Sequence, residues 1–236
     1  MDNGYEEVLE RLKEERIRLG WSQTQISEML EIEQSHYSKV ERGVARLTYY
    51  EVQRLYEIDV DADYVFMGIR QNQKFADALK EKDDLQLSIL LEILYTWVEY
   101  RKINPNLNAH NMRLIRLTCS ENKTLLFSLR RGLDKNQLEM ADLLGVDVKK
   151  LRALENGGTL PDSEIIWKLY KDFGILPAIV VNSREGIISE ISSLIGMLKA
   201  GETERISYTL RDIDGLFQLF LETDNGKGAM QTPQIQ

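Results

Sequence analysis

The feature that most constrains this chain is an internal repeat: a segment near its N-terminus matches a later one when the sequence is shifted by 114 residues. The match runs without a gap from residue 12 to residue 56, and it includes charged, glycine and apolar positions together. A repeat of this length is too long for a solenoid unit, so it predicts two copies of one small domain. The identical pairs are Leu12 and Leu126, Arg16 and Arg130, Leu19 and Leu133, Gln23 and Gln137, Leu30 and Leu144, Glu41 and Glu155, Gly43 and Gly157, Leu55 and Leu169, and Tyr56 and Tyr170.

Each copy contains the pattern of two short helices joined by a tight turn. Apolar residues recur at helical spacing almost throughout the chain. Ser22 and Gln25 have the spacing of a capping box, and Asn136 and Glu139 repeat it in the second copy. Each box predicts a short helix, a turn of a few residues and a second helix that ends at a glycine. This arrangement is typical of the helix-turn-helix unit, whose second helix lies in the major groove of DNA. The second helices are predicted over 34–42 and 148–156.

A family resemblance follows from these motifs. Residues 12–65, which include RLGWSQTQISEMLEIEQSHYSKVERG, resemble the phage-repressor/Cro-type (XRE) helix-turn-helix family, and residues 126–181, with KNQLEMADLLGVDVKKLRALENGGTLP, are similar to it. The resemblance implies an all-α fold with two five-helix domains that bind operator DNA, usually as dimers, and regulate transcription. The first copy departs from the family in having Glu31 where a turn glycine is preferred, whereas the second has Gly145. A non-glycine residue at positive φ costs about 1 kcal/mol, which a domain tolerates.

The resemblance also implies roles for individual residues. Arg16 with Glu41, and Arg130 with Glu155, match the structural ion pair of the family. Glutamine pairs with adenine edges and lysine with guanine acceptors, so an outward face of this kind is suited to reading bases. A side chain at a helix N-terminus is suited to binding phosphate. The DNA-binding candidates of the first copy are Gln23, at such an N-terminus, and Gln34, Ser35, Ser38, Lys39 and Arg42.

The outward face of the second copy differs from that of the first. Val148 stands in place of Gln34, and Ala153 in place of Lys39. The remaining polar side chains are basic and suit phosphates better than bases. Two interpretations remain open: this copy binds DNA through a looser code, or it is a degenerate copy that serves packing or dimerisation. Its DNA-binding candidates are Gln137, Lys149, Lys150 and Arg152.

The segments around the two copies are predicted to be helical as well. A broad apolar stripe between Leu87 and Val98 indicates a core helix, and two amphipathic helices near the C-terminus indicate a hairpin that packs on the body or forms a homodimer. The alternating Asp59, Asp61 and Asp63 indicate a polar loop. The predicted boundaries are 1–70 for the first domain, 71–120 for a helical connector, 121–183 for the second domain, 184–223 for the hairpin and 224–236 for a flexible tail.

Composition excludes several classes of function. The single cysteine, Cys119, leaves no disulfide framework, and His36 and His110 lack the spacing of a metal site. We find no nucleophile motif and no glycine-rich phosphate loop, so we expect neither an enzyme nor a cofactor or metal. No apolar stretch reaches the roughly 18 residues of a membrane span, so we expect a cytoplasmic protein without a membrane partner.

The formal charge of −8 argues against binding nucleic acid until it is divided by region. Residues 1–70 hold 9 basic and 15 acidic side chains, whereas residues 121–183 hold 9 of each. We therefore expect weak non-specific affinity in a sequence-specific DNA-binding regulator, a repressor of the phage-repressor/Cro type. Its partners would be double-stranded operator DNA, a second copy of the chain and an unknown protein or peptide effector. The alternative is a protein-interaction module, antitoxin-like or peptide-responsive, in which the second copy is degenerate.

Overall fold

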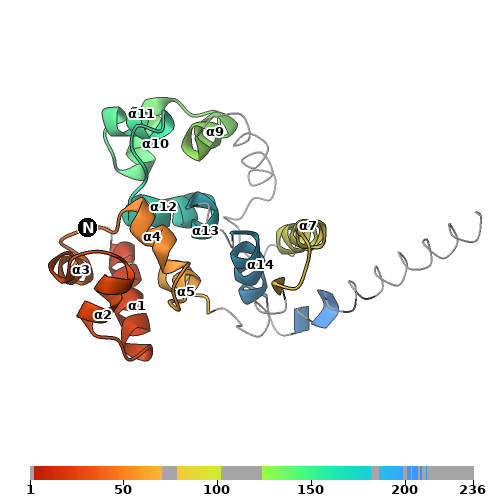
Figure 1. The fold of residues 1–236 in the computed structure, drawn as a ribbon. Helices are drawn as coiled ribbons and strands as arrows, with labels where there is room; N and C mark the ends of the chain where they lie inside the picture. The colour runs from red at the N-terminus through yellow and green to blue at the C-terminus, as the bar shows by residue number, and fades with distance from the viewer. Residues whose placement is uncertain are drawn as a thin grey trace, which may run out of the picture. The chain divides into compact units, whose positions relative to one another are not determined.

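The computed structural model describes residues 3–70, 79–101, 124–181 and 186–198, together with residues 201, 202, 204–206, 208 and 211. All regular structure in these ranges is helical, which confirms the all-α fold class. The chain divides into two compact units, Met1–Met197 and Leu198–Gln236, and every labelled helix belongs to the first (Figure 1). Most of the predicted connector, most of the second hairpin helix and the whole tail lie outside the described residues.

The first helical group consists of five helices, of which the second, fourth and fifth begin at a residue whose side chain caps the helix. At the start of the second helix, the Ser22 hydroxyl accepts from the Gln25 amide and the Gln25 side chain accepts from the Ser22 amide, which is the predicted capping box. Thr48 and Glu51 form a second box at the fourth helix. The five helices are α1 (Asn3–Arg18), α2 (Gln23–Met29), α3 (Gln34–Glu41), α4 (Tyr49–Leu55) and α5 (Ala62–Met67).

The core of this group is built by one face of each helix. Ile26 and Leu30 from the α2 segment meet Tyr37 and Val40 of α3, and all four are buried. They belong to a larger buried cluster that also contains residues of α1, α4 and α5. Because Tyr37 and Val40 point into this cluster, the other side of α3 is turned to solvent, as the sequence predicts.

The acidic segment before α5 corrects one sequence prediction. A polar loop is expected over Asp59, Asp61 and Asp63, but this is wrong for Asp63, which lies within α5 and is fully buried. Its carboxylate accepts a hydrogen bond of 2.9 Å from the hydroxyl of Tyr56. Asp61 caps the helix through the Tyr64 amide. The acidic side chains therefore start and anchor a helix, which spacing alone does not reveal.

A second helical group follows the connector. Its caps include the predicted box of Asn136 and Glu139 and an Asp147 side chain that accepts from the Lys150 amide. The helices are α9 (Leu125–Gly132), α10 (Gln137–Leu144), α11 (Val148–Glu155), α12 (Ser163–Phe173) and α13 (Pro177–Val180). Shifted by 114 residues, α3 has the same bounds as α11.

The turns of the two groups have the same backbone conformation at corresponding positions. The turn after α2 places Glu31 at φ 59°, and the turn after α10 places Gly145 at φ 65°. Both values lie in the left-handed region that favours glycine, so Glu31 carries the strain expected of a side chain there. The helices α3 and α11 are followed by Gly43 and Gly157, with φ values of 74° and 71°.

Two further helices in the first unit pack against each other, and one of them, α14 (Gly186–Gly196), also contacts α13. The stripe predicted between Leu87 and Val98 lies on α7 (Asp84–Tyr100), where Leu87, Leu91, Leu94 and Val98 are buried. This helix packs against α14, whose Ile191 and Leu194 are buried. Within the pair, the hydroxyl of Tyr95 donates to the buried carboxylate of Glu190.

Candidate nucleic-acid interface

A buried ion pair holds the end of α3 against the end of α1. The Arg16 Nε donates to Glu41 Oε1 at 2.7 Å, and its Nη1 donates to the carbonyl oxygen of Trp21 at 2.8 Å. Only 12% of the Arg16 side chain and 5% of the Glu41 side chain are exposed. The sequence predicts this pair as a structural element, and its geometry shows why: it fixes the position of α3 on the rest of the domain.

Gln23 joins the same network from the first turn of α2. Its Nε2 donates to Glu41 Oε2 at 2.7 Å, and its Oε1 accepts from the Nε2 of Gln34 at 3.0 Å. The amide thus links the buried ion pair to the first residue of α3. The sequence predicts a phosphate contact for Gln23 but gives no sign of these two bonds, because they depend on how α2 and α3 cross.

Electrostatics keep Glu41 charged in this setting. Burial disfavours the carboxylate, but hydrogen bonds from Arg16 and Gln23 outweigh that effect, so the pKa of Glu41 is lowered. The pKa of Arg16 is raised, chiefly by its hydrogen bond to Glu41. The pair therefore stays ionised at neutral pH, and Gln23 keeps a charged acceptor for its amide.

The outward face of α3 is polar and accessible. Gln34, Ser35, Lys39 and Arg42 are exposed, and Ser38 is half-buried. The Ser35 hydroxyl donates to Glu33 at 3.2 Å, and Arg42 Nε donates to the Ser38 carbonyl oxygen at 3.1 Å. Within the described part of the chain Lys39 has no ion-pair partner. The structure therefore brings together the five residues that the sequence assigns to this face, four of them on α3 and Arg42 at its C-terminal cap.

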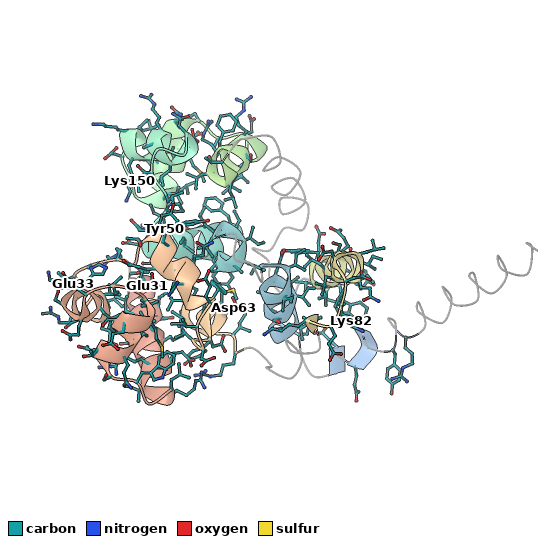
Figure 2. The ribbon with its side chains drawn as sticks, in the orientation of Figure 1. Glu31, Glu33, Tyr50, Asp63, Lys82 and Lys150 are labelled. Atoms are coloured by element: carbon teal, nitrogen blue, oxygen red, sulfur yellow. The ribbon has the colours of Figure 1, made fainter. Side chains whose placement is uncertain are left out.

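Acidic side chains lie at the turn that leads into α3. Glu28, Glu31 and Glu33 are exposed on or beside this turn. Glu31 and Glu33 are labelled in Figure 2. Glu31 forms an ion pair with Arg54, so part of its negative charge is neutralised. Negative charges so near the face of α3 repel phosphates, so any affinity for DNA has to come from directed contacts rather than from a general positive field.

The second helical group contains the same buried network. Arg130 Nε donates to Glu155 Oε1, and Arg130 Nη1 donates to the Lys135 carbonyl oxygen at 3.0 Å. Gln137 Nε2 donates to Glu155 Oε2 at 2.9 Å. Arg130 and Glu155 are both buried. Each of these bonds has its counterpart 114 residues earlier in the network of Arg16, Gln23 and Glu41.

The outward face of α11 is made differently. Lys149 and Arg152 are exposed, whereas Lys150 is half-buried and its Nζ lies 3.2 Å from Asp162 Oδ2. Arg152 Nε donates to Gln137 Oε1 at 2.9 Å, so Gln137 again links the buried pair to the outward helix. Lys149 is also exposed, and within the described residues it forms no ion pair or hydrogen bond of this kind.

Comparison with known proteins supports the assignment of the first group. Residues 12–57 match a family model described as helix-turn-helix, the segment that runs from within α1 to just past α4. No curated protein and no solved structure matches the chain significantly. The match supports a DNA-binding helix-turn-helix regulator in general. It covers the residues of the Arg16 network and of the α3 face.

Neither a membrane-spanning helix nor a metal site is present in the described ranges. No helix there is both long and apolar enough to cross a bilayer. No group of three or more His, Cys, Asp and Glu residues in those ranges is arranged to hold a metal ion.

Proposed function

We propose that this protein is a sequence-specific DNA-binding transcriptional regulator, acting as a repressor by occupying operator DNA. The observation that carries the proposal is the exposed polar face of α3, held on a helix-turn-helix scaffold by the network of Arg16, Gln23 and Glu41. In such a unit the second helix enters the major groove. Here that helix is α3.

The residues of the α3 face are suited to different tasks at the DNA. Gln34 offers a donor and an acceptor that match the major-groove edge of adenine, and Lys39 donates to the acceptors of guanine. Ser35 lies beside Gln34 at the first turn and contributes a short donor and acceptor. Gln23 and Arg42 stand at either end of the face, where contacts to phosphate set the register of the helix.

We infer further that α9 to α13 are a second copy of the domain. Support comes from the network of Arg130, Gln137 and Glu155 and from the left-handed turn at Gly145, each of which has a counterpart 114 residues earlier. The face of α11 presents Lys149 and Arg152, which suit phosphates. In this copy, contact with DNA would serve mainly to position the protein on the phosphate backbone and less to select a base sequence.

A second candidate function has an observation in its favour. Leu138 and Leu143 of α10 are 60% and 43% exposed, and exposed apolar side chains beside an outward helix suit a protein or peptide partner. In that case the second copy is an interaction module rather than a DNA reader. Salt separates the two candidates, because phosphate contacts release counterions and lose affinity steeply as salt rises, whereas apolar docking does not.

The proposal is tested by selecting bound duplexes from random DNA and then changing the α3 face. We expect the full chain to enrich a defined sequence, and the triple variant Q34A/S35A/K39A to lose specific binding by about 100-fold or more, since each bidentate contact is worth about 1–3 kcal/mol. The matched control is K82A/S88A, which also removes one positive charge and one exposed hydroxyl, both far along the chain from α3. Helical content by circular dichroism should be the same for all three proteins.

Either of two results would overturn this assignment. One is that the triple variant keeps the affinity and the preferred sequence of the unchanged chain. The other is that the control variant loses them to the same extent as the triple variant. Failure of the unchanged chain to enrich any sequence, together with salt-independent binding of a protein partner, would instead favour the interaction module.

A further inference from the structure

The last two helices of the second group, α12 and α13, pack into the first group. Ile166 and Trp167 of α12, and Val181 after α13, belong to the same buried cluster as Ile26 and Val52. A hydrophobic core shared in this way resembles a permanent interface rather than the polar contact of two loosely linked domains.

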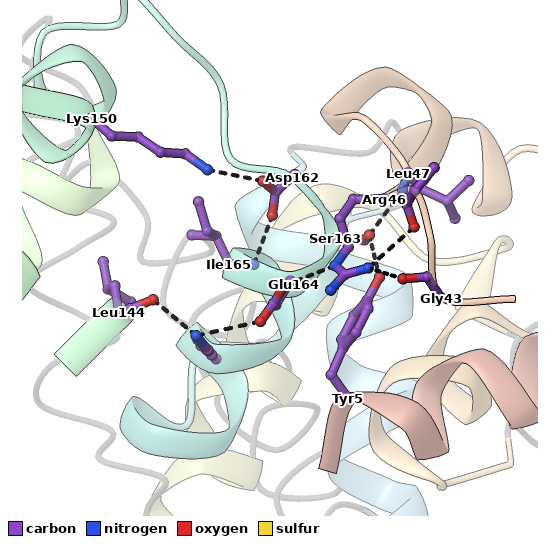
Figure 3. A network of polar contacts seen from close by, with 12 residues as sticks. Tyr5, Gly43, Arg46, Leu47, Leu144, Lys150, Asp162, Ser163, Glu164 and Ile165 are labelled. Atoms are coloured by element: carbon purple, nitrogen blue, oxygen red, sulfur yellow. Dashed lines mark hydrogen bonds and ion pairs between the residues drawn. The ribbon is translucent and has the colours of Figure 1, made fainter. Parts of the chain in front are cut away.

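Buried hydrogen bonds fasten this contact. The hydroxyl of Ser163, at the start of α12, lies 2.5 Å from the hydroxyl of Tyr5 and accepts from the amide of Leu47 at 3.1 Å. The amide of Ser163 donates to the Leu47 carbonyl oxygen at 2.9 Å. Arg46 Nε donates to Glu164 Oε2 at 2.7 Å beside them (Figure 3). Tyr5 and Ser163 are both 1% exposed, so these bonds are shielded from water, and removal of one partner would leave the other buried without a hydrogen bond.

While it is fastened to the first group, α12 also remains part of the second. Lys150 of α11 reaches Asp162, which caps α12, and Lys168 Nζ donates to the carbonyl oxygen of Leu144 at the end of α10 at 3.0 Å (Figure 3). One helix is therefore held by both groups. This arrangement fixes α10 and α11 to the first group without relying on the connector.

Part of the contact between the groups is reciprocal. Helix α13 packs against α5, and the shift of 114 residues places these two helices on each other. The Nε2 of Gln53 in α4 donates to the carbonyl oxygen of Val181, just after α13, at 3.0 Å. On the other side, Tyr170 of α12 lies near Asp63 in α5, and the pKa of Tyr170 is raised by burial and by that carboxylate. Each group thus places its fourth helix beside the fifth helix of the other, as in an isologous interface.

We propose that the two groups form an internal pseudo-dimer, so that a single chain reads one DNA site made of two different half-sites. This inference rests on the proposed function, and it adds the form of the DNA. A homodimer with identical reading helices recognises a palindrome, because the symmetry of the protein is mirrored in the site. Here α3 offers Gln34, Ser35 and Lys39, whereas α11 offers Lys149 and Arg152, so the site is asymmetric.

The shared core gives the pseudo-dimer two further properties. A second chain cannot use α5 for pairing in the same way, because α13 already covers it. The spacing of the half-sites is also set by a packed interface and not by a flexible linker, so it should tolerate little change. At the half-site bound by α3 the protein selects bases, and at the half-site bound by α11 it contacts the phosphate backbone of the DNA.

The test uses the unchanged full chain and the duplex that it selects from random DNA. Titration followed by native mass measurement should give one duplex per chain, and hydroxyl-radical footprints should show two protected patches about one helical turn apart. Insertion of about five base pairs between the patches turns them to opposite faces of the DNA. We expect this insertion to weaken binding by about 100-fold, because two linked binding sites gain affinity on that scale over one site alone.

Matched variants assign the two patches. K149A/R152A should remove protection from one patch and lower the salt dependence, while the preferred bases of the other patch stay the same. K82A is the control for charge.

Two chains per duplex on a palindrome would overturn the pseudo-dimer and leave DNA binding intact. One protected patch, or no effect of the insertion, would overturn it as well. If the chain selects no sequence at all, the proposed function fails and this inference with it.

Discussion

The first and second helical groups have the same internal skeleton and different outward faces. In both, an arginine at the end of one helix holds a glutamate at the end of another, and a glutamine connects that pair to the outward helix. The outward helix α3 presents Gln34 and Lys39, whereas α11 has Val148 and Ala153 at those positions. The buried network is therefore the same in the two groups, whereas the residues of the outward face differ.

This difference separates what folds the domain from what the domain recognises. Buried polar networks leave little freedom, because removing one partner exposes the other to an apolar interior. Outward residues make few hydrogen bonds within the protein, so their identity depends on the molecule that the domain binds. Buried positions that are equal in the two groups should therefore affect stability, and outward positions on α3 and α11 that differ should affect binding.

The largest effect is expected at the buried ion pairs. Arg16→Ala and Arg130→Ala each leave a buried glutamate without its partner, and this costs about 3–5 kcal/mol of unfolding free energy. Urea unfolding followed by circular dichroism measures both. Arg131→Ala, at an exposed position one residue further on, is the control and should cost less than about 1 kcal/mol. A loss of that small size for Arg130→Ala would mean that the second network does not support its group.

An exchange of faces should change recognition without changing the fold. In the variant V148Q/K149S/A153K, α11 carries the polar residues of α3, and we expect the preferred base sequence under α11 to become like that under α3. Each new bidentate contact contributes about 1–3 kcal/mol of base discrimination. Selection from random DNA reads out the result, and Lys149→Ser alone shows how much comes from the lost charge. An unchanged preference would contradict a DNA-reading role for α11.

The left-handed turn positions should respond in opposite directions. Glu31→Gly relieves the strain of a side chain at φ 59° and should stabilise the protein by about 1 kcal/mol, whereas Gly145→Ala should destabilise it by a similar amount. Urea midpoints suffice to measure both. Glu31→Gln keeps the side chain and removes only the ion pair with Arg54, so it isolates the backbone effect. Equal shifts for Glu31→Gly and Glu31→Gln would disprove the backbone explanation.

The smallest expected effect is a loss of stability at acidic pH. Burial opposes ionisation of Glu15, but hydrogen bonds from Arg18 and Arg70 outweigh it, and the pKa values of Glu15 and Glu41 are both lowered. Their stabilisation is therefore present above the unfolded pKa of about 4.3 and is lost as pH falls through the lowered folded pKa. Glu41→Gln should flatten the fall of stability below about pH 4, whereas the exposed Glu28→Gln should not. Urea unfolding at stepped pH measures the slope.

The sequence predicts those parts of the structure that depend on local pattern. Ser22 and Gln25 mark the start of α2, and Gly43 marks the end of α3, because caps act within a few residues. Tyr37 and Val40 place the inward face of α3 through helical periodicity alone. The partners Arg16 and Glu41 follow from the family resemblance.

The docking of α12 on the first group could not be predicted in this way. It depends on the bonds of Ser163 to Tyr5 and Leu47, which both lie more than a hundred residues before it and belong to no motif. The bond between Gln23 and Gln34 is hidden for a similar reason, since it depends on how two helices cross. The alternating acidic pattern predicts a loop at Asp63, because it carries no sign of Tyr56, whose hydroxyl donates to the buried Asp63 carboxylate.

The most direct test of the central claim is methylation protection on the selected duplex, which reports contact at guanine N7 in the major groove. With the unchanged chain we expect protected guanines within one half-site, and with Q34A/S35A/K39A we expect that protection to disappear while K82A/S88A retains it. Protection that is the same for all three proteins, or that is absent from the major groove, would contradict the claim that α3 reads DNA.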